Sequence, residues 1–241
     1  VDAQGRPLDT KKQFYALAFA IYGLSEYARA TGDAQATEEA AALYCAIETR
    51  SYDPAGNGYE EAATHDWQPI ADMRLSDKDA NERRTMNTHL HILEAYTNLL
   101  RVWPDAALRR QTRNLLEIFL DRIADPRTGH LGLFFDEHWQ LRSEGVYSFG
   151  HDIEASWLML ETAFVLGDDA LTERTRACCA RIADAALEGY LEDGSLLYER
   201  HADGTLDRER HWWVQAECVV GLFYLYRFHG RREALAPALK T

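Results

Sequence analysis

The chain has 241 residues, of which 46% are apolar, and a formal net charge of −13. This apolar content is enough for a substantial core, and the acidic balance argues against a nucleic-acid or anionic-membrane partner. The four cysteines form no CxxC motif and no apolar run is long enough to span a membrane, so we expect a cytoplasmic protein with reduced thiols and without disulfides or a zinc site.

Apolar residues recur at helical spacing through most of the chain. Gly32, Pro104 and Gly167 mark helix ends, because proline cannot continue a helix and glycine readily terminates one. The pattern predicts seven helices and the start of an eighth after residue 230, with ranges of about 9–31, 34–49, 85–102, 106–124, 151–166, 169–187 and 212–229.

Three turn-rich connections separate these helices, at 51–80, 125–149 and 188–210. Their Gly, Asp and Pro residues are typical of turns. We expect a short β-hairpin around Tyr59 and Trp67 and a strand at 131–135. Connections of this length often border a functional site.

The first, third, fifth and seventh helices align as an internal repeat. The residues that end the first three, Asp33, Asp105 and Asp168, lie 72 and 63 residues apart (33 to 105, and 105 to 168). Aromatic, His and Glu residues recur at the leading turn of each of these inner helices, which favours a closed toroid with a shared central pocket over an open solenoid. The aligned sets are Tyr15, Asn87, Gly150 and Trp213, and one turn later Phe19, His91, Glu154 and Glu217.

A toroid of about six hairpins at this period needs roughly 380 residues. We therefore expect residues 1–241 to form a single (α/α) barrel domain that is truncated at both ends. This incomplete central portion would hold about seven to eight helices, joined by short β-hairpin connections.

The stretch from Tyr147 to Trp157 carries the clearest chemical signal. His151 and Glu154 stand three residues apart, on one face of the first turn of the predicted fifth helix. An imidazole beside a carboxylate at a helix start can be tuned for proton transfer near neutral pH. In the alternative interpretation, Asp152 and Glu154 only complement the helix dipole.

The predicted third helix contains His89 and His91. Two residues two apart on a helix point about 200° away from each other, so an HxH metal site is disfavoured. His91 shares a polar face with Asn87, Glu94 and Asn98, which a solvent-filled cavity would explain. His89 is assigned to packing or hydrogen bonding between helices, and His91 could instead be a satisfied core histidine.

The predicted seventh helix opens with Trp212 and Trp213, close to Gln215 and Glu217. Indole rings stack on the apolar face of a sugar, and carboxylates and amides bind its hydroxyls. The pattern therefore favours a sugar platform over simple core packing. Tyr15 lies at the same height on the first helix and offers a phenol, or is an ordinary core tyrosine.

Four segments resemble the cellobiose 2-epimerases of the N-acylglucosamine 2-epimerase family. They are FYALAFAIYGLSEYARATGD at 14–33, NTHLHILEAYTNLLRVWPD at 87–105, YSFGHDIEASWL at 147–158 and HWWVQAE at 211–217. The resemblance covers nearly the whole chain and implies an all-α (α/α)6 barrel. It also implies an enzyme that needs no cofactor; we further expect a monomer without a metal site.

The resemblance implies 2-epimerisation of the reducing-end glucose of a β-1,4-linked disaccharide to mannose. The substrate would be cellobiose, with lactose and mannobiose as further candidates. A base removes the weakly acidic C2 proton and donors stabilise the cis-enediolate. The resemblance implies that His151 transfers the proton at C2 and that His91 helps to open the ring and binds its oxygens. It implies polar contacts for Asn87 and Tyr15 and stacking for Trp212 and Trp213. Glu154 would orient its neighbours, and Glu217 would be a further carboxylate of the pocket.

The chain also departs from the family pattern. The family's second catalytic histidine and an N-terminal arginine of its pocket have no counterpart here. The remaining histidines do not begin an inner helix: they are His65, His130, His138, His201 and His229. We therefore expect these 241 residues alone to be nearly inactive and the parent protein to be the enzyme.

Other functions stay open from sequence. An (α/α) toroid glycoside hydrolase could use Asp152, Glu154 and Glu217 as acid and base. An N-acylglucosamine 2-epimerase or an aldose–ketose isomerase of the same superfamily would share the enediolate. A non-catalytic helical-repeat scaffold would instead spread polar residues over a concave surface.

Overall fold

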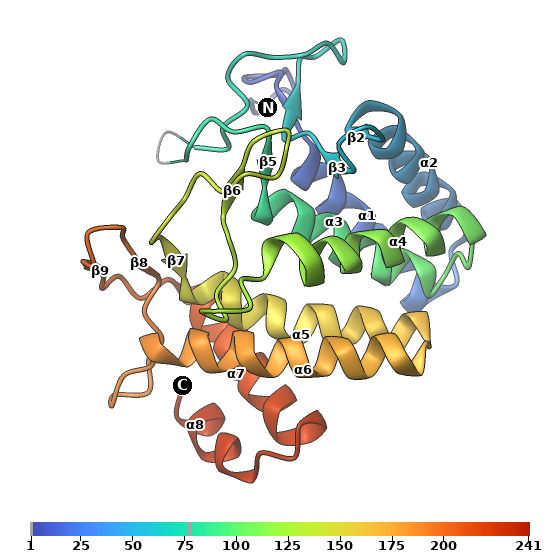
Figure 1. The fold of residues 1–241 in the computed structure, drawn as a ribbon. Coiled ribbons are helices and arrows are strands. Elements are labelled where there is room, and N and C mark those ends of the chain that lie inside the picture. The colour runs from blue at the N-terminus through green and yellow to red at the C-terminus, as the bar shows by residue number, and fades with distance from the viewer. Residues whose placement is uncertain (1, 77–78) are drawn as a thin grey trace. The chain divides into compact units, whose positions relative to one another are not determined.

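The computed structural model describes residues 2–76 and 79–241. These residues form eight α-helices, in agreement with the predicted number (Figure 1). They are α1 (Phe14–Thr31), α2 (Ala34–Arg50), α3 (Met86–Leu100), α4 (Ala106–Ile118), α5 (Phe149–Leu166), α6 (Asp169–Ala186), α7 (Trp212–Phe228) and α8 (Leu235–Lys240). A π-helical turn, Phe119–Ile123, continues α4, and short 3-10 turns follow α6 and precede α8.

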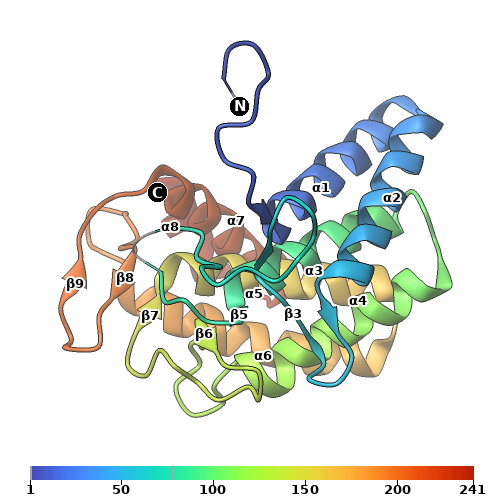
Figure 2. The same cartoon turned by 90° about the horizontal axis from the view of Figure 1, so that it is seen from above.

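The chain divides into two compact units. The first unit comprises Val1–Asp105 and Phe134–Gln140, and the second comprises Ala106–Leu133 and Leu141–Thr241. Within the first unit α1 packs against both α2 and α3, and within the second α5 packs against α6 and α7 (Figures 1 and 2). The expectation of a single domain stays a prediction.

Inner and outer helices differ in how they are buried. In α3 nearly every residue is buried and in α5 most residues are, including polar ones. A helix that is shielded on all sides lies inside a fold, whereas an amphipathic helix covers its surface. The outer helices α2, α4 and α6 bury only one face each. The polar residues buried on α3 and α5 therefore need hydrogen-bond partners or a functional role.

Short antiparallel strands fix where three inner helices begin. The strands β1 (Lys12–Gln13), β5 (Arg84–Thr85) and β7 (Tyr147–Ser148) directly precede α1, α3 and α5. Each pairs with a strand from the connection after the following outer helix, and the pairs are β1 with β4 (Ala62–Ala63), β5 with β6 (Phe134–Phe135) and β7 with β8 (Glu199–Arg200).

Two further strand pairs complete the connections. The strands β2 (Tyr52–Asp53) and β3 (Gly58–Tyr59) form the hairpin predicted around Tyr59, and β9 (Leu206–Asp207) pairs with β8. Trp67 lies outside the hairpin, in a left-handed backbone conformation with φ of 63°. The predicted strand at 131–135 is reduced to β6, preceded by a single bridge between Ala124 and Leu131.

The start of α5 corrects the sequence prediction. We expected the helix to begin at His151, with Gly150 interrupting the backbone, but it begins at Phe149 because the Ser148 hydroxyl caps it. Gly150 lies inside the first turn. A Cβ atom there would stand 2.8 Å from both Trp213 Cη2 and Val214 Cγ2. The glycine is therefore required by close packing of α5 against α7.

The internal repeat is confirmed residue by residue. Tyr15, Asn87, Gly150 and Trp213 are each the second residue of α1, α3, α5 and α7, respectively. Phe19, His91, Glu154 and Glu217 follow four residues later in each helix, one turn further along. The register read from the terminating residues thus holds at the helix starts.

Arg84 ties the connections of the first unit together. Its side chain is fully buried. Nη1 donates to the carbonyls of Gly56 (3.1 Å) and Glu137 (2.7 Å), and Nη2 donates to Asp53 Oδ2 at 2.7 Å. The guanidinium lies 5.1 Å from the Trp139 ring centre. These contacts hold the β2–β3 hairpin against residues 137–139, next to the start of α3.

Within the described residues, no helix combines the length and the apolar character that crossing a membrane requires.

Candidate functional site

In the first unit, the leading turns of α1 and α3 bring His91 to two aromatic rings. The imidazole centre lies 4.5 Å from that of Phe19 and 6.3 Å from that of Tyr15. His91 is 8% exposed, and its Nδ1 lies 3.1 Å from Glu94 Oε2. A carboxylate at Nδ1 favours a proton on that nitrogen and leaves Nε2 to act on a ligand. Asn87 is half-buried one turn earlier on α3.

The structure confirms that His89 is a packing residue, but its hydrogen bonds run to β3 and to the N-cap of α3, not to another helix as predicted. Its ring is fully buried. Nδ1 lies 2.7 Å from the Thr85 carbonyl and therefore donates to it, while Nε2 accepts from the Tyr59 amide at 3.0 Å. Burial lowers the pKa of His89 to about 4. A neutral imidazole with both nitrogens engaged joins α3 to β3.

Asn98 corrects the interpretation of the polar face of α3. We expected a solvent-filled cavity to explain it, but Asn98 is buried and joins α3 to α1. Its Oδ1 accepts from Arg29 at 3.3 Å, and its Nδ2 donates to the Tyr22 carbonyl at 3.2 Å. The far end of this polar face is therefore structural, because hydrogen bonding between helices satisfies it.

Sequence analysis did not select Glu61, although it supports the start of α3. Its carboxylate is 2% exposed and accepts from the hydroxyls of Thr85 (2.6 Å) and Thr88 (2.8 Å). Thr85 is also the N-cap of α3, accepting from the Thr88 amide at 3.1 Å. Burial raises the pKa of Glu61 to about 7, although both hydroxyls oppose this. The only sequence feature that pointed toward Glu61 was its place in the long 51–80 connection.

In the second unit, His151 is held at the first turn of α5. Its Nδ1 lies 2.7 Å from Ser148 Oγ, and its ring centre lies 5.0 Å from that of Trp213 at an angle of 53°. The ring is half-buried. One nitrogen therefore has a fixed partner, and one face of the ring lies against an indole.

The carboxylates predicted beside His151 lie on α5 and α7. Glu154 is 7% exposed, one turn after Gly150. Glu217 Oε2 accepts from Trp157 Nε1 at 2.7 Å. Trp157 was not selected from sequence, since an indole at helical spacing is typical of a core position. The structure shows that it fixes the position of Glu217.

The two adjacent tryptophans of α7 lie in different surroundings. Trp213 is half-buried and contacts both His151 and Tyr198, whereas Trp212 is 81% exposed. The structure thus brings Trp213 to His151 and leaves Trp212 at the surface. Gln215 was expected at a pocket rim, but its amide pairs with the backbone N–H and C=O of Leu196 (2.9 and 2.8 Å).

A buried acid–imidazole pair next to His151 was also missed. Asp152 accepts from His130 Nδ1 at 2.7 Å and from the Leu131 amide at 2.9 Å. Burial raises the pKa of Asp152, and the contact with His130 opposes this. His130 also stacks on Tyr147, with ring centres 4.0 Å apart. The hydrogen bonds of Asp152 therefore hold residues 130–131 against the first turn of α5.

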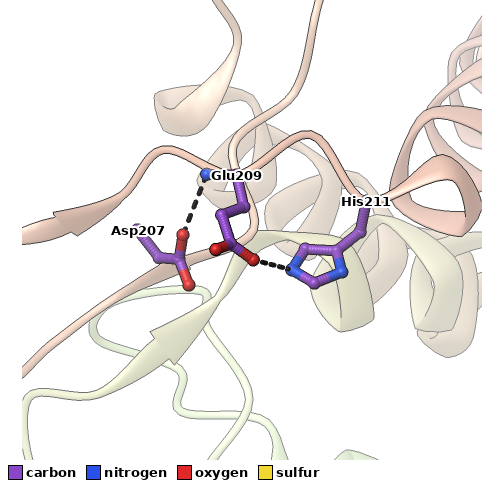
Figure 3. A group of neighbouring side chains, drawn as sticks. All are labelled: Asp207, Glu209 and His211. Carbon is purple, nitrogen blue, oxygen red and sulfur yellow. Dashed lines mark hydrogen bonds and ion pairs between the residues drawn. The ribbon is translucent and has the colours of Figure 1, made fainter.

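Asp207, Glu209 and His211 form a cluster of side chains just before α7 (Figure 3). Ligand atoms of Asp207, Glu209 and His211 lie within 4.8 Å of one another. Asp207 Oδ1 accepts from the Glu209 amide at 2.9 Å, and Glu209 Oε2 lies 3.4 Å from His211 Nε2. Carboxylates and imidazole are donors for divalent metals, but contacts within the cluster account for this arrangement. The His211 ring packs against Tyr198, which contacts Trp213.

The structure thus places two groups of predicted residues, one in each unit. Tyr15, Asn87 and His91 belong to the first unit, and the second contains His151, Glu154, Trp213 and Glu217. Each group lies at the leading turns of inner helices, as the repeat predicted. Their convergence around one sugar stays a prediction.

Comparisons with known proteins agree with these motifs. The family model for N-acylglucosamine 2-epimerase (GlcNAc 2-epimerase) matches residues 1–240. A cellobiose 2-epimerase of Bacteroides fragilis is 57% identical over 98% of this chain and 60% of its own length. One of Dictyoglomus turgidum is 38% identical over 94% of this chain and 57% of its own length.

A solved structure shows the same fold. The cellobiose 2-epimerase of Bacillus thermoamylovorans superposes with a TM-score of 0.91 and 38% identity, over 99% of this chain and 62% of that one. This confirms the predicted all-α class of helical-hairpin toroids. The chain spans about 60% of the length of the relatives it matches. It belongs to the N-acylglucosamine 2-epimerase family.

Proposed function

We propose that the protein containing this chain is a cellobiose 2-epimerase. It would interconvert the reducing-end glucose of cellobiose with mannose, without a cofactor. The observation that carries the proposal is His151, which stands at the family motif with Nδ1 bonded to Ser148 and its ring against Trp213. The names of the most similar relatives supply the substrate class.

The chemistry requires a base at C2, because the proton next to the aldehyde is only weakly acidic. A histidine changes charge near neutral pH and suits this task. His151 removes the proton, and the electron pair left at C2 becomes the cis-enediolate. Developing negative charge on the sugar oxygen needs hydrogen-bond donors. We assign this stabilisation, together with ring opening, to His91, with Asn87 and Tyr15 as polar neighbours.

The remaining predicted residues would bind and orient the sugar. Trp213 offers its indole next to His151, and Trp212 is assigned a stacking role further out. Glu154 would orient its neighbours, and Glu217, held by Trp157, would bind sugar hydroxyls. Return of the proton to the opposite face needs a second acid. The family pattern assigns it to a histidine with no counterpart among these 241 residues.

The surroundings of Asp152 argue against the glycoside hydrolase alternative. A glycosidase needs two carboxyl groups that reach the glycosidic bond. Asp152 is fully buried and already accepts two hydrogen bonds, from His130 and Leu131. An acid enclosed in this way cannot protonate a leaving group. A proton-transfer reaction centred on histidine fits the observed contacts better.

The test uses the full-length product of the gene that encodes this chain, incubated with cellobiose in D2O. We expect a disaccharide of unchanged length that ends in mannose and carries deuterium at C2. The His151→Ala variant should lose this activity. His201→Ala, at an exposed histidine of the second unit, is the matched control and should keep it.

Other products would assign other functions. Release of glucose would indicate a hydrolase, a ketose would indicate an isomerase, and full turnover by His151→Ala would remove His151 from the mechanism. Comparing kcat/KM for cellobiose, lactose, mannobiose and N-acetylglucosamine decides the preferred substrate. We also propose a cytoplasmic monomer, which size-exclusion chromatography and cell fractionation test.

A further inference from the structure

Glu94 directs a largely buried carboxylate at the ring of His91. Its side chain is 12% exposed, and its Oε2 lies 3.1 Å from His91 Nδ1. Acidic side chains are seldom buried to this extent without a partner. Among the described residues, His91 is the one hydrogen-bond and ion-pair partner of Glu94. The imidazole of His91 is therefore the group on which this carboxylate acts.

An ion pair with the same spacing on α1 has a different environment. Glu26 lies three residues before Arg29, and the two side chains, each 43% exposed, form an ion pair. Water and salt screen a surface pair of this kind, so it contributes little. The partner of Glu94 is an imidazole that is only 8% exposed. The charge of Glu94 therefore acts on His91 with less screening.

The contact determines which nitrogen of His91 carries the proton. An ionised carboxylate can only accept hydrogen bonds, so His91 Nδ1 must donate to Glu94. In the neutral ring Nε2 then holds the lone pair. No residue that the structure describes forms a hydrogen bond with this Nε2. When Nε2 takes up a proton, the Nδ1–H bond to Glu94 persists, so no side chain has to turn.

Two aromatic side chains of α1 restrict the same imidazole. The Phe19 ring centre lies 4.5 Å from that of His91 at an angle of 39°, and the Tyr15 centre lies 6.3 Å away at 52°. Phe19 and Tyr15 meet edge to face, with centres 5.8 Å apart. A ring bonded at one nitrogen and packed against other rings has little rotational freedom.

The chemistry of sugar ring opening gives the tautomer its importance. The C1 hydroxyl loses its proton to a base, its electron pair forms the aldehyde C=O, the C1–O5 bond breaks, and O5 takes up a proton. His91 Nε2 can receive the first proton through its lone pair and then deliver it to O5. No proton is gained or lost overall. A ring protonated at Nε2 could not begin this sequence, because Nε2 would have no lone pair for the hydroxyl proton.

We propose that Glu94 is a positioning residue that holds His91 as the Nδ1–H tautomer and presents the Nε2 lone pair to the sugar. This inference rests on the proposed function, in which His91 opens the sugar ring. It adds the reacting atom and the group that orients it. The family resemblance gives no role to Glu94.

The direct test is nitrogen NMR of full-length protein labelled with ¹⁵N-histidine, recorded above the titration range of His91. The His91 signals are assigned by their loss in His91→Ala. We expect neutral His91 to carry its proton on Nδ1, and Glu94→Ala to shift the population toward Nε2–H. His89 is an internal control, because its Nδ1 donates to the Thr85 carbonyl and should do so in both proteins. Protonation of wild-type His91 at Nε2, or an unchanged tautomer in Glu94→Ala, would overturn the assignment.

Kinetics test whether the tautomer matters for the reaction. Glu94→Ala should lower kcat for cellobiose by about 10- to 100-fold, because a misplaced catalytic group reacts slowly. Glu94→Gln keeps an oxygen that can accept from Nδ1–H, so it should retain the tautomer and restore most of kcat. A kcat within twofold of wild type in Glu94→Ala would refute the role, and so would a Glu94→Gln variant as slow as Glu94→Ala.

Glu26→Ala is the matched control, because it removes a glutamate with the same i,i+3 spacing from the neighbouring helix. It should keep both kcat and the His91 tautomer. If Glu94→Ala fails to fold, Glu94→Met replaces it, since methionine has a similar length and offers no carboxylate. Absence of epimerisation by wild type would count against the proposed function, whereas full activity of Glu94→Ala would count against this inference alone.

Discussion

Replacing Glu61 by glutamine should make the free energy of unfolding less dependent on pH. Glu61 is enclosed beneath the start of α3, where two threonine hydroxyls are its hydrogen-bond partners. Glutamine has nearly the same shape and can bond to both hydroxyls, but it carries no charge at any pH. The substitution therefore isolates the cost of keeping a carboxylate in this position.

The magnitude follows from the raised pKa. Burial moves the pKa of Glu61 from 4.5 to about 7 in the folded protein. Between these values the folded state binds more protons than the unfolded state, so the free energy of unfolding falls as pH rises. At about 1.4 kcal/mol per pKa unit, the wild type should lose about 2–3 kcal/mol between pH 5 and pH 8 relative to Glu61→Gln.

Urea unfolding of both proteins at pH 5, 6, 7 and 8, followed by circular dichroism, measures this difference. Comparison of the two chains cancels the titration of all other groups. Glu39→Gln, at an exposed position of α2, gives the effect of deleting a surface charge and should stay within about 0.5 kcal/mol of wild type. A stability difference between wild type and Glu61→Gln that stays constant from pH 5 to pH 8 would refute the reasoning.

Three further substitutions test the packing around the two groups of site residues by urea unfolding. Arg84→Ala removes a fully buried side chain together with its hydrogen bonds to Gly56, Glu137 and Asp53 and should cost about 2–3 kcal/mol; a loss below 1 kcal/mol would contradict the role of Arg84. Gly150→Ala forces a methyl group against Trp213 and should cost about 1–3 kcal/mol, with a change in tryptophan fluorescence; an unchanged protein would contradict the packing argument. Asp152→Ala leaves His130 Nδ1 and the buried Leu131 amide without their acceptor and should cost about 2 kcal/mol or more, which an unchanged urea midpoint would disprove.

The helices and their register could be predicted because local signals determine them. Gly32 and Gly167 adopt left-handed conformations at the helix ends (φ of 75° and 66°). Pro104 and the capping aspartates mark other boundaries. Once the helix ends are aligned, the spacing of the repeat places each inner-helix residue. The start of α5 was misplaced because Gly150 serves a contact with α7, which the local sequence does not reveal.

The functional groups could be predicted only where side chains share one helix face. His91 with Glu94 follows from helical spacing, and so does the separation of His89 from His91. The same geometry separates Trp212 from Trp213 by about 100°, which explains why only one of these rings meets His151.

Contacts between residues far apart in sequence were not predictable in this way. Asp152 finds His130 and Glu61 finds Thr85 through the fold, over separations of 22 and 24 residues. No local pattern encodes such a pair, because each partner alone looks like an ordinary polar residue of a turn or a helix start. The burial of Asp152 and Glu61 depends on how the connections pack against α5 and α3, which only the folded structure shows.

The central claim is that His151 moves the proton at C2 of the reducing-end sugar. The most direct measurement is the deuterium content at C2 of the mannose-ended product formed from cellobiose in D2O by the full-length protein. We predict one solvent deuterium at C2, with both product and label lost in His151→Ala. An epimer formed without solvent deuterium at C2, or at an undiminished rate by His151→Ala, would contradict the mechanism.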